Sequence, residues 1–111
     1  FIDQKVICNY KKVANFVSST YLDYIVIMSF SSALDQLILS QLIHKPFKYI
    51  GMMASLSKVQ RIRASLIKKG FDATLLNKLH SPIGFSLPCK SPAEIAVSVA
   101  AQLIQIRNQV L

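Results

Sequence analysis

Basic residues crowd the first turns of a predicted helix, where the helix dipole favours negative charge. A turn of small and hydroxyl-bearing residues, 53–57, directly precedes this helix. Its free backbone N–H groups, the hydroxyls of Ser55 and Ser57 and the ammonium of Lys58 can converge on one anion. Without an anion, Lys58 and Arg61 should each cost roughly a few tenths of a kcal/mol beside the positive end of the dipole. The predicted anion contacts are Ser55, Ser57, Lys58 and Arg61, and the alternative is a solvated basic face without a ligand.

A strand, a helix and a second strand are expected to position this turn. Residues 24–30 form an uncharged, β-rich run typical of a strand buried on both faces, and residues 47–53 repeat that pattern. Between them, apolar residues at helical spacing predict a helix over residues 33–44, capped by Ser31 or Ser32. A connection of this length implies parallel pairing and a right-handed crossover.

Ligands of such folds bind outside the carboxyl ends of the strands. Two loops of the sequence lie there, residues 29–32 and residues 53–58. Ser29 and Asp35, in and just after the first loop, are therefore further binding candidates, although the electrostatics of a helix start also explain Asp35. The fold class indicated is α/β, a Rossmann-like parallel sheet flanked by helices.

The remaining elements follow from helix start and stop signals. The helix that carries the basic residues should end at residues 68–70, and a short helix is expected over residues 72–79. Ser91, Pro92 and Glu94 form the start signal of a final helix. The apolar residues of that helix cover more than half of its circumference, which predicts packing on two sides.

The N-terminal 22 residues give the weakest signals. Residues 5–10 could form a short strand, and residues 11–19 could form a helical turn or two. At 111 residues the chain has room for a single domain, residues 1–111. Because it begins at Phe1 rather than Met, we expect a fragment of a longer protein or a chain that lacks N-terminal residues.

The composition favours a folded, basic protein. Hydrophobic residues make up 52% of the chain and charged residues 16%, which leaves ample apolar surface for one core. No uncharged run is long enough to span a bilayer, so no membrane partner is expected. The net charge of +8 favours anionic partners without choosing among them. Nucleic acid as a partner is supported by charge alone. NAD(P) as a cofactor is disfavoured because the dinucleotide-binding fingerprint GxGxxG is absent.

No catalytic or metal-binding constellation stands out. His80 has no acid or nucleophile near it in sequence. Cys8 and Cys89 show neither metal-ligand spacing nor a preceding secretory segment. We therefore expect a reducing, cytoplasmic setting and a protein that is not an enzyme.

Four motifs follow one another along the chain: YIGMMASLSK at residues 49–58, GF at 70–71, HSPIG at 80–84 and SPAEIAVSVAAQLI at 91–104. In sequence and spacing they resemble the C-terminal Rossmann-like domain of the xanthine dehydrogenase accessory-factor family, the XdhC/CoxI type. The resemblance extends from about residue 24 to residue 107. Four spaced motifs make this a specific resemblance.

The two loops match the family in part. In the turn after the second strand, Ser55 and Lys58 match the family pattern. Ala54 replaces a glycine there, and Leu56 stands where a basic residue is common. The family's strand-end motif carries Thr and His ahead of an Asp, whereas the motif SFSSALD keeps Ser29 and Asp35 and has no histidine.

The resemblance implies an accessory protein that binds molybdenum cofactor, protects it, and assists its sulfuration and delivery to a molybdenum hydroxylase such as xanthine dehydrogenase. Such a hydroxylase or a cofactor-sulfurating enzyme would be the partner. The cofactor carries a phosphate and an anionic dithiolene-bound metal, which suits a basic helix N-terminus. The alternative is a structural or protein-interaction module with a degenerate, empty nucleotide-type site.

The resemblance also implies a fold that is truncated at its N-terminal side. The family's Gly-rich first βα turn and its N-terminal cysteine-bearing domain have no counterpart in the sequence. A truncated sheet leaves an apolar strand edge that must be paired or covered. We therefore expect a homo-oligomer, in the simplest case a dimer, formed through the sheet edge or the final helix.

Overall fold

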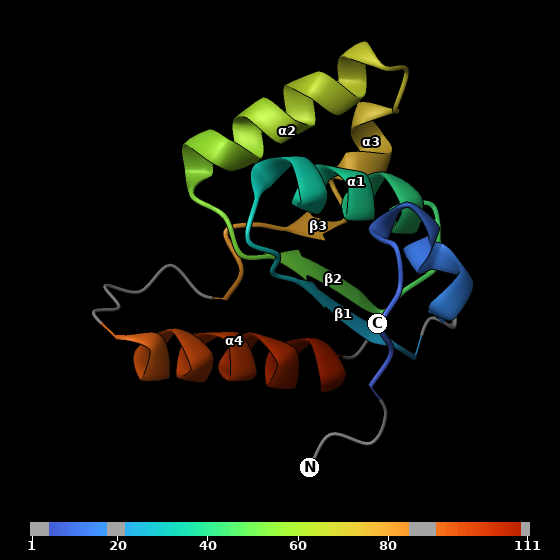
Figure 1. Cartoon of the computed structure of the whole chain (residues 1–111). Coiled ribbons are helices and arrows are strands. Elements are labelled where there is room, and N and C mark those ends of the chain that lie inside the picture. The colour runs from blue at the N-terminus through green and yellow to red at the C-terminus, as the bar shows by residue number, and fades with distance from the viewer. Residues whose placement is uncertain (1–4, 18–21, 85–90, 110–111) are drawn as a thin grey trace.

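The computed structural model describes residues 5–17, 22–84 and 91–109, and it shows strands that alternate with helices (Figure 1). In chain order, the elements are η1 (Tyr10–Phe16), β1 (Tyr24–Ile27), α1 (Ser32–Leu42), β2 (Tyr49–Met52), α2 (Leu56–Lys68), α3 (Ala73–Leu76), β3 (Leu79–His80) and α4 (Pro92–Arg107).

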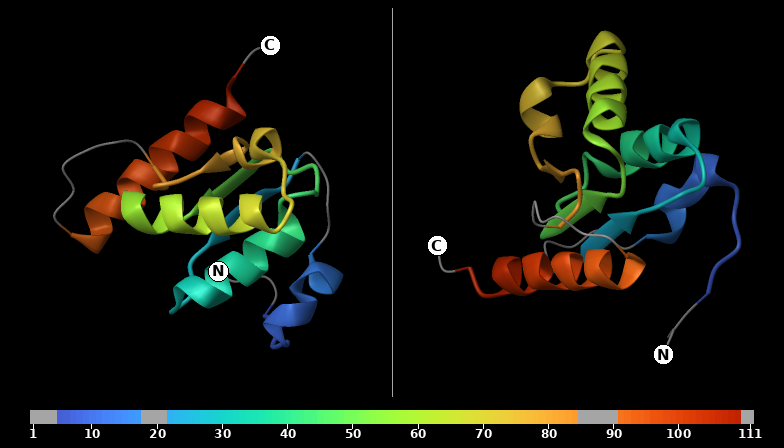
Figure 2. Two further views of the ribbon diagram at one scale, coloured as in Figure 1. Left: turned by 90° about the horizontal axis from the view of Figure 1, so that it is seen from above. Right: turned by 90° about the vertical axis from the view of Figure 1, so that its left-hand side faces the viewer.

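The strands form one parallel sheet in the order β1-β2-β3. The predicted parallel pair is confirmed, with Tyr24 aligned to Tyr49 at one end of the register. Both strands are shorter than predicted. β2 lies between two strands and is buried along its whole length, because helices cover both of its faces (Figure 2).

β3 is a strand that the sequence pattern did not reveal. The predicted helix over residues 72–79 ends at Leu76, and Leu79 and His80 pair with β2 instead. His80 therefore lies in a strand and not in a loop. A strand of two residues has no periodicity of its own, so only the neighbouring strand defines it.

β1 is an edge strand, and the prediction that both of its faces are buried is wrong. Ile27 is buried in the core, whereas Val26 is 38% exposed and Met28, just beyond the strand, is 63% exposed. Successive side chains of a strand point to opposite faces. One face of β1 therefore contributes to the core, and the other remains largely open to solvent.

The core lies between the sheet and the helices α1 and α2. These helices and α3 lie on one side of the sheet, and α4 crosses the other side (Figure 2). α3 is joined to the core by Leu76. The buried core residues are Ile27, Leu39, Leu42, Ile43, Ile50, Met52, Ile62, Leu66 and Leu76.

Local serine caps fix the starts of the three longer helices, of which the sequence predicts Ser91 and offers Ser31 or Ser32, whereas the cap at Ser55 is seen only in the structure. The Oγ atoms of Ser31, Ser55 and Ser91 each accept a hydrogen bond from the backbone N–H three residues later. Each cap satisfies one of the donors that a first helical turn leaves unpaired. These helix starts depend on short-range contacts, which explains why the sequence locates them well.

The N-terminal segment differs from its prediction. Residues 5–9 contain no regular strand, and the Asn9 side chain accepts a hydrogen bond from the Lys11 N–H and caps the start of η1. The helical turns predicted over residues 11–19 are confirmed by η1 as far as Phe16, and residues 18 and 19 lie outside the described residues.

One side chain holds α4 against the sheet. The Oε1 atom of Gln102 accepts hydrogen bonds from the Gly84 N–H at 2.9 Å and from the Tyr49 hydroxyl at 2.5 Å. The Nε2 atom of Gln102 donates to the Gly84 carbonyl at 3.1 Å. Gly84 has a φ of +83°, and a Cβ atom there would lie 2.7 Å from the Ser98 Oγ. Gly84, the last residue of the HSPIG motif, is thus the residue against which α4 packs.

Within the described residues α4 packs on one side only, so its predicted packing on a second side stays a prediction. Ser98 is buried on the side of Gly84, whereas Val97 is 68% exposed and Ile104 is 50% exposed. Within the described ranges these two side chains remain open to solvent, because α4 is the outermost layer on its side of the sheet (Figure 2). No helix in the described part of the chain is long and apolar enough to cross a membrane.

His80 is expected to make folding stability depend on pH. Its ring stacks on Tyr49 with a centroid separation of 4.6 Å, and burial lowers the pKa of His80 below its ordinary value of 6.5. The unfolded chain therefore binds a proton at a higher pH than the folded chain. The free energy of unfolding should fall as the pH drops from about 6.5 towards the folded-state pKa.

A His80→Phe variant keeps a stacked ring and removes the titrating nitrogens. Urea unfolding at about pH 7.5 and about pH 5.5, followed by circular dichroism, should show a smaller pH dependence in this variant than in the parent chain. A His44→Phe variant, which makes the same substitution at an exposed position, serves as the control for the substitution itself. Equal pH dependence in the parent chain and the His80 variant would contradict the prediction.

Candidate functional site

The carboxyl ends of β1 and β2 bring the two predicted loops together. The Lys58 Nζ, in the first turn of α2, lies 3.0 Å from the Asp35 Oδ2. Asp35 lies in the first turn of α1. The Asp35 Oδ1 accepts a hydrogen bond from the backbone N–H of Ser29 at 2.9 Å. Through this hydrogen bond and this ion pair, Asp35 connects the loop after β1 to the helix after β2.

The Asp35 carboxylate is fully buried, with 0% of the side chain exposed, whereas the Lys58 side chain is 21% exposed. Burial alone raises the pKa of this carboxyl, but hydrogen bonds from Ser29 and the Lys58 ammonium outweigh it and hold the pKa below its ordinary 3.8. Asp35 is therefore ionised at neutral pH. The negative group that compensates Lys58 at the start of α2 comes from the chain itself.

Ser55 and Ser57 lie at the exposed start of α2. The Ser55 Oγ caps the helix by accepting from the Lys58 N–H, and it lies 3.3 Å from the Ser57 Oγ. The N–H groups of Leu56 and Ser57 belong to the first turn and have no acceptor within the helix. These two groups and the Ser57 hydroxyl are suitably placed to donate to an anion.

Arg61 is separate from the ion-paired cluster. It lies one turn beyond Ser57 on the same side of α2, and it is exposed. Within the described ranges its guanidinium makes no hydrogen bond or ion pair. Arg63, by contrast, donates to the Ala73 carbonyl at 3.2 Å and to the Asn77 Oδ1 at 2.6 Å. Arg63 therefore joins α2 to α3, whereas Arg61 is available to a ligand.

The six predicted residues are thus placed in three ways. Ser29, Asp35 and Lys58 form one hydrogen-bonded cluster, and Ser55 and Ser57 lie beside it at the start of α2. Arg61 stands apart, one turn further along. Their contact with an anion stays a prediction.

The ion pair itself was missed at the level of sequence. Asp35 and Lys58 each have a sufficient local explanation, as a helix-start acid and as a basic surface residue. A positional signal was nevertheless present. Each lies in the first helical turn after one of two adjacent parallel strands, and the carboxyl ends of such strands meet at one edge of the sheet.

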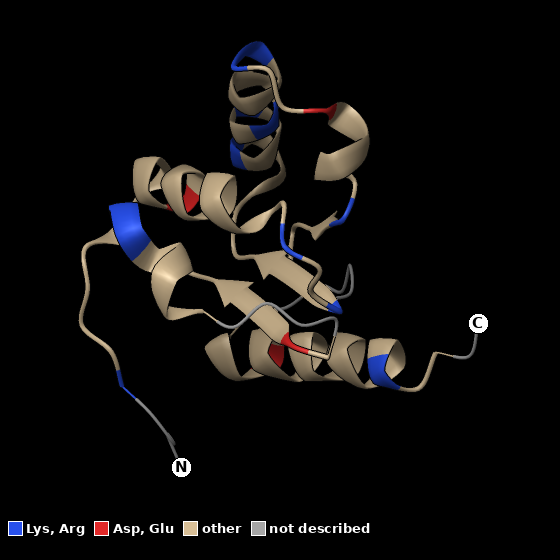
Figure 3. Ribbon diagram, turned by 90° about the vertical axis from the view of Figure 1, so that its right-hand side faces the viewer, with Lys and Arg blue, Asp and Glu red and all other residues tan. Residues whose placement is uncertain are grey.

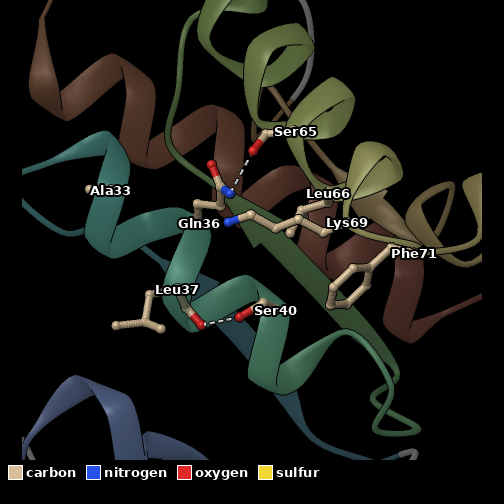
Figure 4. A pocket seen from close by; sticks show the side chains of 8 residues that line it. All are labelled: Ala33, Gln36, Leu37, Ser40, Ser65, Leu66, Lys69 and Phe71. Carbon is tan, nitrogen blue, oxygen red and sulfur yellow. Dashed lines mark hydrogen bonds between the residues drawn. The ribbon is translucent and has the colours of Figure 1, made fainter.

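A cavity of about 670 Å³ lies between α1 and α2 and contains none of the six predicted residues (Figure 4). The Gln36 Nε2 donates to the Ser65 Oγ at 2.9 Å between the two helices. Among the described residues, no three His, Cys, Asp or Glu side chains gather where they could hold a metal ion. The lining residues are Ala33, Gln36, Leu37, Ser40, Ser65, Leu66, Lys69 and Phe71.

Known proteins of similar sequence point to one family. The family model of the XdhC Rossmann domain matches residues 2–103. One relative is the uncharacterized protein YqeB of Escherichia coli, which is 36% identical over 74 residues. Another, from Bacillus subtilis, is named as a probable component of xanthine dehydrogenase and is 32% identical over 76 residues. These alignments cover 67% and 68% of the chain but only 14% and 21% of the relatives.

A solved structure shows the same fold. The crystal structure of a xanthine dehydrogenase from Bacillus halodurans superposes with a TM-score of 0.71 at 30% sequence identity. The match covers 91% of this chain and 28% of that one. The chain is therefore similar to a part of each of these longer proteins, and it belongs to the XdhC Rossmann-domain family.

Proposed function

We propose that this chain handles molybdenum cofactor as an accessory protein for a molybdenum hydroxylase such as xanthine dehydrogenase. Its role is to bind, protect and deliver the cofactor in the cytoplasm, without catalysis of its own. Membership of the XdhC family supports this proposal, as does a relative named for xanthine dehydrogenase. The observation that carries it is the open start of α2, at the carboxyl end of the parallel sheet, where such folds bind ligands.

The residues at the start of α2 fit the phosphate of the cofactor. The N–H groups of Leu56 and Ser57, the Ser57 hydroxyl and the Arg61 guanidinium would hold that phosphate. The described residues offer no cluster of metal ligands, so the metal would stay bound to the dithiolene of the cofactor. When bound, the cofactor supplies redox chemistry to the hydroxylase that receives it.

A second candidate is a protein-interaction module whose nucleotide-type site is empty. The observation that favours it is the ion pair, because the Lys58 ammonium is already neutralised by a buried carboxylate. Ala54 in place of the family's glycine points the same way. In this case the family fold would present a surface to a partner, and the open start of α2 would bind nothing.

An anaerobic equilibrium titration of the chain with isolated molybdenum cofactor separates the two candidates. We expect saturable binding that NAD does not displace. Arg61→Ala should weaken binding by about tenfold, because one charge-assisted hydrogen bond contributes about 1.4 kcal/mol. Lys68→Ala, an exposed cation at the far end of α2, is the matched control and should bind like the parent chain.

Absence of saturable binding would reject the cofactor proposal and favour the interaction module. Equal weakening by the Arg61 and Lys68 substitutions would reject the start of α2 as the site. Lys58→Ala is a poor test of binding. It also leaves the buried Asp35 carboxylate without its counter-ion and so lowers the free energy of unfolding. Melting temperatures should therefore be measured beside every titration.

A further inference from the structure

A second cavity, of about 270 Å³, lies beside the start of α2. It is lined mainly by residues of α2 and of the segment from α3 to just beyond β3, and Figure 2 shows α3 lying beside α2. Its innermost lining is apolar, because Leu39, Ile62 and Leu76 are core residues that are each at most 3% exposed. Leu56 and Gln60 also line it and are exposed, so the cavity opens to solvent.

This cavity reaches the residue at which the proposed phosphate site begins. Leu56 is the first residue of α2, so its backbone N–H belongs to that site, and the same residue lines the cavity. Gln60 lines the cavity one turn further along the same side of α2. The larger cavity between α1 and α2, by contrast, has no lining residue among residues 53–64. A ligand held by its phosphate at the start of α2 can therefore place a second group in the smaller cavity.

The polar groups of the cavity are amides and a hydroxyl that can pair with a neutral ligand. The Asn77 Oδ1 accepts from Arg63, and this hydrogen bond orients the amide of Asn77. The Ser81 hydroxyl donates to the Met52 carbonyl at 2.9 Å, so its oxygen can still accept a hydrogen bond. The exposed amide of Gln60 offers both donors and an acceptor. The lining thus provides donors and acceptors without a net negative group.

Most of the positive charge of α2 lies outside this cavity. Figure 3 shows blue segments along α2, but Arg63 is the one cation among the described residues that line the cavity. Its guanidinium already donates to the Ala73 carbonyl and to the Asn77 Oδ1. The described lining residues also include no carboxylate. The cavity therefore suits an uncharged group, whereas the anionic part of the same ligand suits the start of α2 and Arg61.

We propose that this cavity takes the pterin ring of the molybdenum cofactor while the start of α2 holds the phosphate. The inference rests on the proposed function and assigns the second part of the same site. A pterin is a flat, bicyclic ring whose edge carries N–H donors and N and O acceptors, which amides and hydroxyls can pair with. Pockets for drug-sized ligands measure about 300–1,000 Å³. A cavity of about 270 Å³ therefore admits one ring system and leaves the phosphate and the dithiolene outside.

Free hydroxymethylpterin tests the cavity without the phosphate site, because it carries neither phosphate nor dithiolene. Its fluorescence polarisation should rise as the chain is added, and inorganic phosphate should not reverse the rise. Gln60→Trp, which places a bulky ring at the opening, should weaken pterin binding by about tenfold, and Gln60→Ala by a smaller factor. Ala64→Trp, at an exposed alanine of α2 outside the cavity lining, is the matched control and should bind pterin like the parent chain. Absence of pterin binding by the parent chain would overturn the inference.

Titrations with isolated molybdenum cofactor distinguish this inference from the proposed function. Gln60→Trp should weaken cofactor binding by about tenfold and Ala64→Trp should not, with the melting temperature of each variant measured beside the titration. Cofactor binding that is unchanged in Gln60→Trp would overturn the pterin cavity and leave the proposed function standing. Pterin binding that depends on Gln60, in a chain that does not bind the cofactor, would support the cavity as a pterin site and reject the proposed function. Absence of both kinds of binding would reject both.

Discussion

Lys58→Met should lower the free energy of unfolding by about 3 kcal/mol, although Lys58 looks like a surface residue in the sequence. The substitution keeps the apolar stem but leaves the Asp35 carboxylate, which is 0% exposed, without its counter-ion. Urea unfolding at about pH 7, followed by circular dichroism, measures the loss. It should be smaller at about pH 4, because removal of Lys58 allows the pKa of Asp35 to rise and the carboxyl to become neutral.

A double-mutant cycle isolates the pair. Asp35→Asn combined with Lys58→Met removes both charges and keeps an acceptor for the Ser29 N–H. The double variant should be more stable than the sum of the single losses predicts, by at least about 1 kcal/mol. Lys68→Met, an exposed cation in the last turn of α2, should change stability by less than about 0.5 kcal/mol. Additive losses at Asp35 and Lys58 would contradict a coupled ion pair.

Gly84→Ala should destabilise the fold by about 3 kcal/mol, which combines two effects. An L side chain is strained at a φ of +83°, and the added Cβ would lie 2.7 Å from the Ser98 Oγ and 3.2 Å from the backbone of α4. The methyl group should therefore push α4 away from Gly84 and break the Gln102 contacts. Thermal unfolding and tyrosine fluorescence both report this change, because Tyr49 shares the Gln102 side chain.

Gly70→Ala is the matched control for this substitution. Gly70 also has a positive φ, +100°, but an added Cβ would meet no atom within 4 Å. Gly70→Ala should therefore show the backbone strain alone, about 1 kcal/mol. The difference between the two alanine variants measures how closely α4 approaches the sheet. Equal losses of stability in the two variants would mean that α4 moves away from the added methyl group without a cost in free energy.

These contacts determine how the proposed site should be tested. Asp35 and Lys58 hold the two loops together, so substitutions of these residues alter both the free energy of unfolding and ligand binding. Ser57 and Arg61 are exposed at the start of α2 and can be replaced with little effect on the core. Binding experiments with variants of these two residues report on the anion contacts, and variants of the ion pair report on folding.

Short-range contacts define the parts of this protein that could be predicted from the sequence. The helix caps at Ser31, Ser55 and Ser91 each join groups three residues apart. The structure confirms the predicted cap at Ser91 and selects Ser31 from the two serines that the sequence offered. The parallel pairing of β1 and β2 also followed from the sequence, because a helix must connect such strands. The order of four motifs placed the chain in the XdhC family, which the family match over residues 2–103 confirms.

Contacts between distant residues became visible only in the folded chain. Asp35 and Lys58 meet across 23 residues, and Gln102 reaches Gly84 across 18. β3 exists only because β2 lies beside it. The apolar surface of α4 predicted that the helix would be covered on two sides, whereas within the described residues one side packs toward the sheet and the other is exposed. Hydrophobic pattern records the tendency of a surface to be buried, whereas the arrangement of all elements decides which surfaces are buried.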